Sequence, residues 1–132
     1  MRADYISAVL DVAALIPPAH VLSYGDIAVL LESGGPRQVG TVFSRHGDGA
    51  PWWRVIRASG QPPACHEHQA LEYYRAEGTP LRGRTTGEGS SWRVDMSVAR
   101  WNPDPEAMDS LDRIRVELAE ASVSDPCAVL EA

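Results

Sequence analysis

The residues best suited to chemistry in this sequence are its arginines. Every one of its twelve lysine-or-arginine positions is arginine. Four of them, Arg37, Arg45, Arg54 and Arg57, fall in a short stretch that contains a single acid, Asp48. A planar guanidinium with five N–H donors suits phosphates and bases, although a GC-rich genome would also favour arginine over lysine. The local excess of positive charge indicates a surface that could bind phosphates.

The acidity of the chain is concentrated in its last part. The net charge is -6, which by itself argues against a nucleic-acid partner. However, residues 104–132 contain eight acids and two arginines, whereas residues 1–103 contain ten acids and ten arginines. The net negative charge therefore belongs to the last segment, and the first 103 residues are neutral enough to approach DNA.

The two cysteines offer neither a metal site nor a disulfide framework. Cys65 and Cys127 stand far apart without ligand spacing, so we expect reduced thiols, no metal and no cofactor. No apolar run reaches the roughly 18 residues of a membrane span, and an acid at Asp4 argues against a secretory signal. The length of 132 residues suits one domain. We expect a cytoplasmic monomer, associated with the nucleoid when bound to DNA, without a membrane partner.

A pair of short helices is predicted just before and within the arginine-rich stretch. Ser23, followed by Asp26 three residues later, is typical of a helix N-cap and begins a helix over residues 24–32. A Ser-Gly-Gly sequence then ends that helix. Pro36 suits the first turn of the next helix, which continues to about Arg45. The pair predicts a helix-turn-helix, although helical hairpins of this kind are also common in protein cores.

The remaining elements are predicted from apolar periodicity and from glycine and proline. Tyr73 is expected to pack inward, and Met108, Leu111, Ile114 and Leu118 are expected on the buried face of an acidic helix. The elements are a helix over residues 3–16, a loop over 46–51, a strand or extended segment over 52–58, a helix over 67–77 ended by Gly78, a Gly/Ser/Thr-rich loop over 82–91, an apolar segment over 92–101, a boundary over 102–105 and the acidic helix over 106–121.

Three stretches resemble one protein family, in its order and near its spacing. The stretch from Val21 to Ala28 resembles the start of its helix-turn-helix, and the stretch from Pro36 to Gly40 resembles the head of its recognition helix. Residues 51–56, Pro-Trp-Trp-Arg-Val-Ile, resemble its active-site signature, Pro-Cys-His-Arg-Val. The family is that of the O6-alkylguanine-DNA alkyltransferases, and tryptophan in place of the cysteine marks its alkyltransferase-like branch.

The resemblance implies a fold class and a division of the chain. It covers about Tyr5 to Pro103, where Glu77-Gly78 and Trp101-Asn102-Pro103 also resemble family positions. The implied fold is mainly α, a single winged-helix-like helix-turn-helix domain over residues 1–103 with a short extended segment. Residues 104–132 have no counterpart in the family core, and we expect them to form an acidic helical extension.

The resemblance also implies binding without repair. In the repair enzymes the cysteine thiolate attacks the alkyl group of a flipped guanine, and a histidine relays the proton. Trp52 and Trp53 stand at these two positions, which removes both the nucleophile and the base that would activate it. We therefore expect no catalytic residue. The implied partner is double-stranded DNA containing O6-alkylguanine, which the protein would flag for nucleotide excision repair proteins.

Residue roles follow from the matched positions. Arg37 falls on the arginine finger that fills the gap left by the flipped nucleotide, and Tyr24 falls on the tyrosine that helps to rotate the base out. Gly40 falls where the recognition helix approaches the DNA backbone closely in the minor groove. The full set of expected DNA-binding residues is Tyr24, Arg37, Gln38, Gly40, Thr41 and Arg45.

The expected lesion pocket surrounds the signature. Trp52 would form its floor, and Arg54 is expected to hold the segment through carboxylate or backbone contacts. Trp53 could face the pocket or pack beneath it. The segment 59–66 is shorter than the family's lid, which predicts an open pocket that tolerates bulky adducts. The full set of expected pocket residues is Pro51, Trp52, Trp53, Arg54, Val55 and Ser59.

Other functions stay open at this point. One alternative is an enzyme, such as a cryptic alkyltransferase that uses Cys65. Another is a protein-interaction or transcription-associated module that has kept the fold and lost lesion recognition. The acidic segment 104–132 could be a solvated helix packed on the domain, or it could repel DNA or bind a repair protein.

Overall fold

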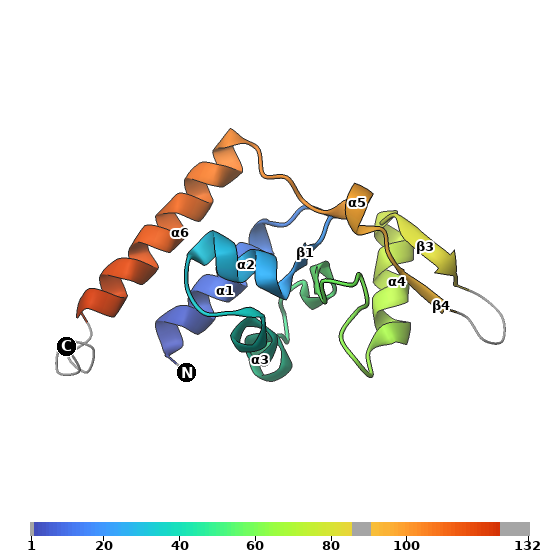
Figure 1. The fold of residues 1–132 in the computed structure, drawn as a ribbon, viewed down its shortest axis with the longest axis horizontal. Helices are drawn as coiled ribbons and strands as arrows, with labels where there is room; N and C mark the ends of the chain where they lie inside the picture. The colour runs from blue at the N-terminus through green and yellow to red at the C-terminus, as the bar shows by residue number, and fades with distance from the viewer. Residues whose placement is uncertain (1, 86–90, 125–132) are drawn as a thin grey trace.

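Helices dominate the structure, a computed structural model that describes residues 2–85 and 91–124 (Figure 1). No helix in this described part is long and apolar enough to cross a membrane. The helices are α1 (Ala3–Leu15), α2 (Tyr24–Leu31), α3 (Pro36–His46), α4 (Glu67–Glu77), α5 (Met96–Ala99) and α6 (Pro105–Ser124), with a 3-10 turn η1 (Trp52–Arg54). The strands are β1 (Leu22–Ser23), β2 (Val55–Ile56), β3 (Leu81–Arg84) and β4 (Ser91–Val94).

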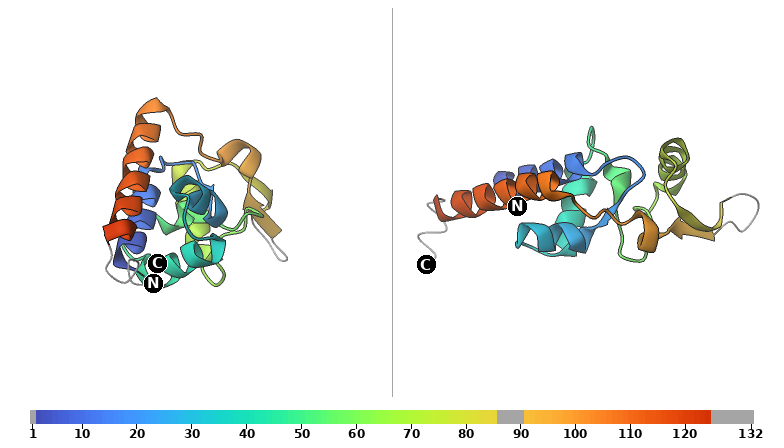
Figure 2. Two further views of the ribbon diagram at one scale, coloured as in Figure 1. Left: turned by 60° about the vertical axis from the view of Figure 1, so that its left-hand side comes forward. Right: turned by 90° about the horizontal axis from the view of Figure 1, so that it is seen from above.

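Two clusters of buried side chains form the core. The first lies among α1, α2, α3 and α6 and includes Ile27 and Val39. The second lies between α4, β2 and β4 and includes Tyr74 and Val94. Helix α6 lies beside α1 at one end of the molecule, and the β3–β4 hairpin lies at the other end (Figures 1 and 2). Trp52 packs against both clusters, so the signature segment joins the two halves of the core.

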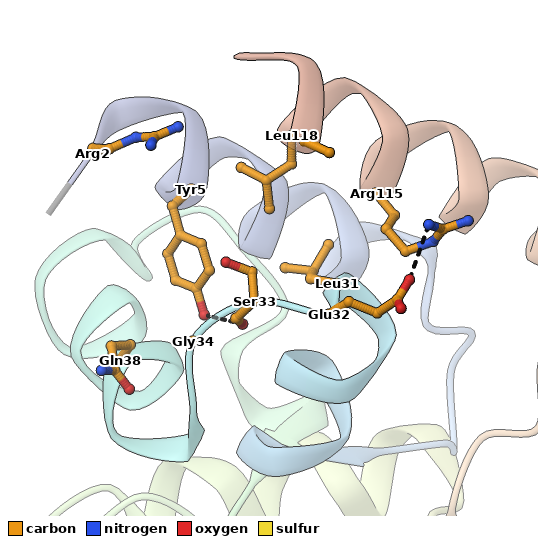
Figure 3. A pocket seen from close by; sticks show the side chains of 10 residues that line it. Arg2, Tyr5, Leu31, Glu32, Ser33, Gly34, Gln38, Arg115 and Leu118 are labelled. Atoms are coloured by element: carbon orange, nitrogen blue, oxygen red, sulfur yellow. Dashed lines mark hydrogen bonds and ion pairs between the residues drawn. The ribbon is translucent and has the colours of Figure 1, made fainter. Parts of the chain in front are cut away.

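Local hydrogen bonds fix the helix-turn-helix. The Ser23 hydroxyl accepts a bond from the Asp26 amide (3.0 Å), and the Asp26 carboxylate accepts one from the Ser23 amide (2.9 Å). This is the capping box predicted for the start of α2. In the turn before α3, the Tyr5 hydroxyl donates to the Ser33 carbonyl (3.1 Å; Figure 3). Gly34 has φ +72° there, and an added Cβ would lie 2.3 Å from the Tyr5 hydroxyl, so the turn requires glycine.

Short strands connect the segments around the signature. β1 and β2 pair in parallel, with Leu22 opposite Val55, and so join the helix-turn-helix to the signature segment. β3 and β4 pair as an antiparallel hairpin. The predicted loop over residues 82–91 is therefore wrong where its ends pair as strands, and residues 86–90 lie outside the described part. Gly83, at φ +95°, interrupts the alternation of side chains in β3, and glycine is depleted in strands, so the sequence pattern did not indicate a strand there.

The acidic helix is present as predicted, with two corrections to its neighbourhood. α6 packs on α1 and α2, with Leu111 and Leu118 buried and Ile114 half-buried. Met108, expected on the buried face, is instead 39% exposed, because the buried face of α6 is formed by Leu111 and Leu118. Tyr73, expected to point inward from α4, is 42% exposed because it stacks on Trp53 at the surface. Residues 125–132 of the predicted extension lie outside the described part.

Candidate nucleic-acid interface

A cavity of about 590 Å³ opens beside helix α3 and the signature. Its volume lies within the range of small-molecule sites in proteins. Three parts of the chain supply its wall: the helix-turn-helix, the signature with the loop that follows it, and the start of α4. The lining residues are Tyr24, Gly40, Phe43, Ser44, Gly47, Asp48, Trp52, Arg57, Pro63, Ala64, His66 and Gln69.

The helix-turn-helix contributes an aromatic and a glycine to this cavity. Tyr24, half-buried at the start of α2, lies 6.3 Å from Phe43 between ring centroids. Burial raises the pKa of Tyr24, while the nearby charge of Arg57 lowers it by less. A Cβ added to Gly40 would meet no atom within 4 Å. Gly40 therefore does not serve to pack one helix on another, and it leaves the cavity side of α3 open to close approach.

Trp52 forms an aromatic wall held by its neighbours. Its ring centroid lies 5.8 Å from that of Trp53, 5.6 Å from that of His66 and 6.0 Å from that of Tyr73. Trp53 in turn stacks on Tyr73, with centroids 3.7 Å apart and ring planes 4° from parallel. These contacts fix the orientation of the Trp52 indole, which offers one N–H donor and an apolar face but no nucleophile.

A carboxylate behind the signature holds the segment in place. Glu77, at the end of α4, accepts bonds from Trp53 Nε1 (2.9 Å), from Arg54 Nη2 (2.5 Å) and from the Ala19 amide (3.1 Å). Burial would raise the pKa of Glu77, but these hydrogen bonds and the Arg54 charge hold it below its usual value. Arg54 Nη1 also donates to the Ile16 carbonyl (2.9 Å). Arg54 thus contacts a carboxylate and a backbone carbonyl, the arrangement expected from the sequence.

Helix α3 exposes two arginines beside the cavity. Arg37, in the first turn, and Arg45, in the last, are exposed, and neither side chain makes a hydrogen bond or ion pair with any residue the structure describes. Gln38 Oε1 accepts a bond from the Gly35 amide (3.0 Å), and Thr41 Oγ1 donates to the Arg37 carbonyl (2.9 Å). The Gln38 amide group keeps its donors for a ligand, whereas the Thr41 hydroxyl proton is engaged within the helix.

The predicted pocket residues divide between the cavity and its support. Trp52 lines the cavity, as do Tyr24 and Gly40 from the predicted DNA-binding set. Trp53 and Arg54 lie behind the wall and bind Glu77, Val55 is buried in β2, and neither Pro51 nor Ser59 is part of the lining. The remaining residues of the wall were not predicted from the sequence: Phe43, Ser44, Gly47, Asp48, Arg57, Pro63, Ala64, His66 and Gln69.

A second hollow, of about 700 Å³, lies between α1, the α2–α3 turn and α6 (Figure 3). Its arginines are paired with acids. Arg115 binds Glu32 (2.9 Å) and lies 3.6 Å from Asp112, and Arg2 binds Asp4. Within the described part of the chain, these arginines are therefore paired, whereas Arg37 and Arg45 beside the other cavity are not. Tyr5 is the aromatic residue in the lining of this hollow, where the cavity beside α3 has Tyr24, Phe43 and Trp52. Across the described residues, no group of three or more histidine, cysteine or acidic side chains could hold a metal ion.

The fold and the cavity define a helix-turn-helix DNA-binding protein, and comparisons with known proteins identify its family. A model of the "6-O-methylguanine DNA methyltransferase, DNA binding domain" matches residues 4–78. The chain is 36% identical over 104 residues to the DNA base-flipping protein of Escherichia coli (strain K12), with 71% of each chain covered. The DNA base-flipping protein of Shigella flexneri matches with the same identity and coverage.

Solved structures give the same result. S. pombe Atl1 in complex with damaged DNA containing O6-carboxymethylguanine matches with a TM-score of 0.64 and 25% identity, covering 78% of this chain and 100% of that one. S. pombe ATL in complex with DNA matches with a TM-score of 0.62, 26% identity and the same coverage. The chain belongs to the 6-O-methylguanine DNA methyltransferase DNA-binding-domain family. Its predicted resemblance to alkyltransferase-like proteins and its predicted fold class are both confirmed.

Proposed function

We propose that this protein recognises O6-alkylguanine in double-stranded DNA by flipping the lesion into the cavity beside α3, and that it does not repair it. One observation carries the proposal: the cavity between the recognition helix and the signature is walled by Trp52, where a repair enzyme would present a thiolate. The E. coli relative is a DNA base-flipping protein, and the S. pombe relative binds DNA that contains O6-carboxymethylguanine.

The residues of α2 and α3 supply the parts that flipping needs. The exposed Arg37 guanidinium, with no partner in the described part of the chain, is free to enter the base stack, where a planar cation can stack and donate hydrogen bonds. Tyr24 stands at the cavity and would press on the backbone of the flipped nucleotide. Gly40 leaves room for that backbone to come close. Gln38, Thr41 and Arg45 would contact the minor groove and its phosphates.

Selectivity would arise from both the cost of flipping and the contacts in the cavity. Extruding a base costs a few kcal/mol, and less when the base is damaged and weakly paired. O6-alkylation spoils pairing with cytosine, so the lesion is easier to extrude than guanine. The indole face of Trp52 then offers the alkyl group an apolar surface, which an unmodified guanine would not use.

A binding titration tests the proposal. Duplexes with and without O6-methylguanine are compared at a stated salt concentration, because DNA affinity depends steeply on salt. We expect tighter binding of the lesion. We also expect an increase in the fluorescence of a 2-aminopurine placed next to the lesion, because that base loses a stacking neighbour when the lesion leaves the stack. Arg37→Ala should remove most of the lesion preference, whereas the matched variant Arg113→Ala, on the outer side of α6, should keep it.

Two alternatives give different results in the same assays. An alkyltransferase that uses Cys65 would carry the labelled alkyl group from the DNA to the protein. Cys65 is exposed, and its side chain is not part of the cavity wall, although Ala64 and His66 on either side of it are. A transcription-associated or protein-interaction module would bind damaged and undamaged duplexes equally. Either outcome would contradict the proposal and support the corresponding alternative.

The range of lesions is a further part of the proposal. The loop that follows the signature supplies Arg57, Pro63 and Ala64 to the wall of a cavity that opens to solvent. A short loop of this kind should tolerate bulky O6-adducts as well as methyl. Affinities for O6-methylguanine and for a bulky O6-adduct decide the point, and clearly tighter binding of the methyl lesion would count against it.

We propose, finally, that the bound complex flags the lesion for nucleotide excision repair. Excision of O6-methylguanine from a plasmid in a repair extract should require the protein and should be reduced by Arg37→Ala. The acidic α6 would either keep undamaged DNA away or bind a repair partner. Because Leu111 and Leu118 are core residues, this is tested by Asp109→Asn, Asp112→Asn and Glu117→Gln together, not by deletion. A rise in the affinity for undamaged DNA would support repulsion by α6. An unchanged affinity would contradict it.

A further inference from the structure

Three arginines project from one face of the β3–β4 hairpin. Along β3, Arg82 and Arg84 alternate with Leu81 and Gly83, and in β4, Arg93 alternates with Trp92 and Val94. Successive side chains of a strand point to opposite faces. The apolar face packs inward, where Trp92 lies 5.9 Å from Tyr74 between ring centroids. The outer face, which we call the arginine face, consists of Arg82, Arg84, Arg93 and Ser91, all exposed.

The arrangement of this face works against the stability of the hairpin. Arg82 and Arg93 are directly opposite each other in the register, and like charges at such positions repel. In the described part of the chain, none of the three arginines forms a hydrogen bond or an ion pair. The pKa of Asp95 is lowered chiefly by a hydrogen bond from Ser97, and the charge of Arg82 lowers it further without an ion pair between the two side chains. Folding therefore does not explain the three charges, and a negatively charged ligand would.

The arginine face adjoins the cavity beside α3. The Val94 amide of β4 donates to the Gly60 carbonyl (2.8 Å), and a Cβ on Gly60 would lie 3.5 Å from Arg93 Cβ. Gly60 belongs to the loop that supplies Arg57 and Pro63 to the cavity wall. The end of β4 thus contacts the cavity loop, and the hairpin lies at the opposite end of the molecule from the acidic α6 (Figure 1).

We propose that the arginine face binds phosphates of the DNA backbone and extends the DNA interface beyond the helix-turn-helix. The inference rests on the DNA binding of the proposed function, but not on lesion selectivity. Phosphate contacts position a protein on the duplex and carry no direct sequence information. The face would therefore add affinity for damaged and undamaged DNA alike, and would hold the duplex against the cavity.

The test is the salt dependence of DNA binding by the full chain. The variant Arg82→Gln/Arg84→Gln/Arg93→Gln is compared with the wild type on O6-methylguanine and unmodified duplexes. Each lost phosphate contact makes the slope of log K against log salt shallower by about 0.9, so two or three contacts predict a change of about 1.8 to 2.7. Between 50 and 200 mM salt the wild type should then lose about 12- to 42-fold more affinity than the variant. The ratio of affinities for the two duplexes should not change.

Three controls separate contact from general charge. The variant Arg113→Glu/Val116→Glu, on the exposed side of α6, also makes the net charge three units more negative and should leave the slope near that of the wild type. The variant with lysine at all three hairpin positions keeps the charges and should keep the slope. Thermal unfolding of the glutamine variant should be unchanged or shifted upward, because it relieves the repulsion between Arg82 and Arg93.

The outcomes distinguish this inference from the proposed function. If the glutamine variant binds both duplexes with the wild-type slope, the arginine face does not contact DNA and the inference is overturned. A slope change shared by the α6 control would also overturn it. If the wild type shows no preference for O6-methylguanine, the proposed function fails, while a slope change confined to the hairpin variant would still support the phosphate contacts.

Discussion

Replacing Glu77 by glutamine should destabilise the protein more than any nearby surface change. The Glu77 carboxylate binds Trp53 Nε1, the Arg54 guanidinium and the Ala19 amide, and so holds the signature against α4. The side chains of Arg54 and Glu77 are only 16% and 12% exposed. Glutamine keeps one carbonyl oxygen but loses the charge, which leaves the Arg54 guanidinium largely buried without its counterion.

The size of the effect follows from that burial. Removing one partner of a buried ion pair costs about 3–5 kcal/mol. Because glutamine still accepts one hydrogen bond and the pair is not fully buried, we expect about 3 kcal/mol. An unfolding entropy of about 2.1 cal/mol/K per residue near 60 °C gives about 0.28 kcal/mol/K for 132 residues. Each kcal/mol then lowers Tm by about 3.6 °C, so Glu77→Gln should lower Tm by about 11 °C.

The effect should depend on pH in a defined direction. The pKa of Glu77 is lowered in the folded protein, against an ordinary value of 4.5. A carboxyl group of this kind stabilises the fold fully above its unfolded pKa, and the contribution is lost as the pH falls through the folded pKa. The Tm difference between the wild type and Glu77→Gln should therefore be constant near neutral pH and should shrink as the pH falls below 4.5.

Thermal unfolding followed by circular dichroism at a series of pH values measures both quantities. Glu72→Gln is the matched control, because Glu72 lies on the same helix, is exposed and, among the residues that the structure describes, pairs only with the exposed His68. That variant should change stability by less than about 0.5 kcal/mol. A Tm loss for Glu77→Gln no larger than that of the control, or a loss that does not change down to pH 3, would refute the role assigned to the Glu77 carboxylate.

Three further substitutions test the helix-turn-helix. Gly40→Ala should raise stability by about 0.5–1 kcal/mol, because alanine favours helix and its Cβ meets no atom; DNA affinity should nevertheless fall, and an unchanged titration would remove the close-approach role. Gly34→Ala should lower stability by more than about 1 kcal/mol, since it combines a positive φ with a clash against Tyr5, measurable by urea unfolding. Ser23→Ala should cost about 0.5–2 kcal/mol through loss of the bond to the Asp26 amide; a smaller loss in urea would show that the cap is dispensable.

Much of the fold could be predicted because its helices begin and end on local signals. The Ser23–Asp26 box and Pro36 lie at the starts of α2 and α3, and Gly78, at φ +76°, lies at the end of α4. Capping depends on side chains within a few residues of the helix end, so it is visible in the sequence. The resemblance to the family then placed Trp52 beside the recognition helix, which local signals alone could not do.

What could not be predicted depends on contacts between distant segments. The β1–β2 pair joins Leu22 to Val55 across more than thirty residues, and two-residue strands leave no periodicity to detect. The cavity wall likewise takes Arg57 and His66 from a loop whose path is set by the bond between Gly60 and Val94. The position of Trp53 behind the wall depends on Tyr73, a residue that the apolar pattern assigned to the core.

These contacts also bear on the proposal that Trp52 stands where the repair enzymes have their cysteine. A Trp52→Cys change would place a thiol in the cavity, but the adjoining position, where the family has its proton-relaying histidine, is Trp53. The Trp53 indole N–H donates to Glu77, and its ring is stacked on Tyr73, so it offers no base to form the thiolate that attacks an alkyl carbon. Cysteine would also leave empty the volume where Trp52 touches both core clusters. Restoring the nucleophile would therefore weaken the wall that we propose contacts the lesion, without supplying the chemistry of repair.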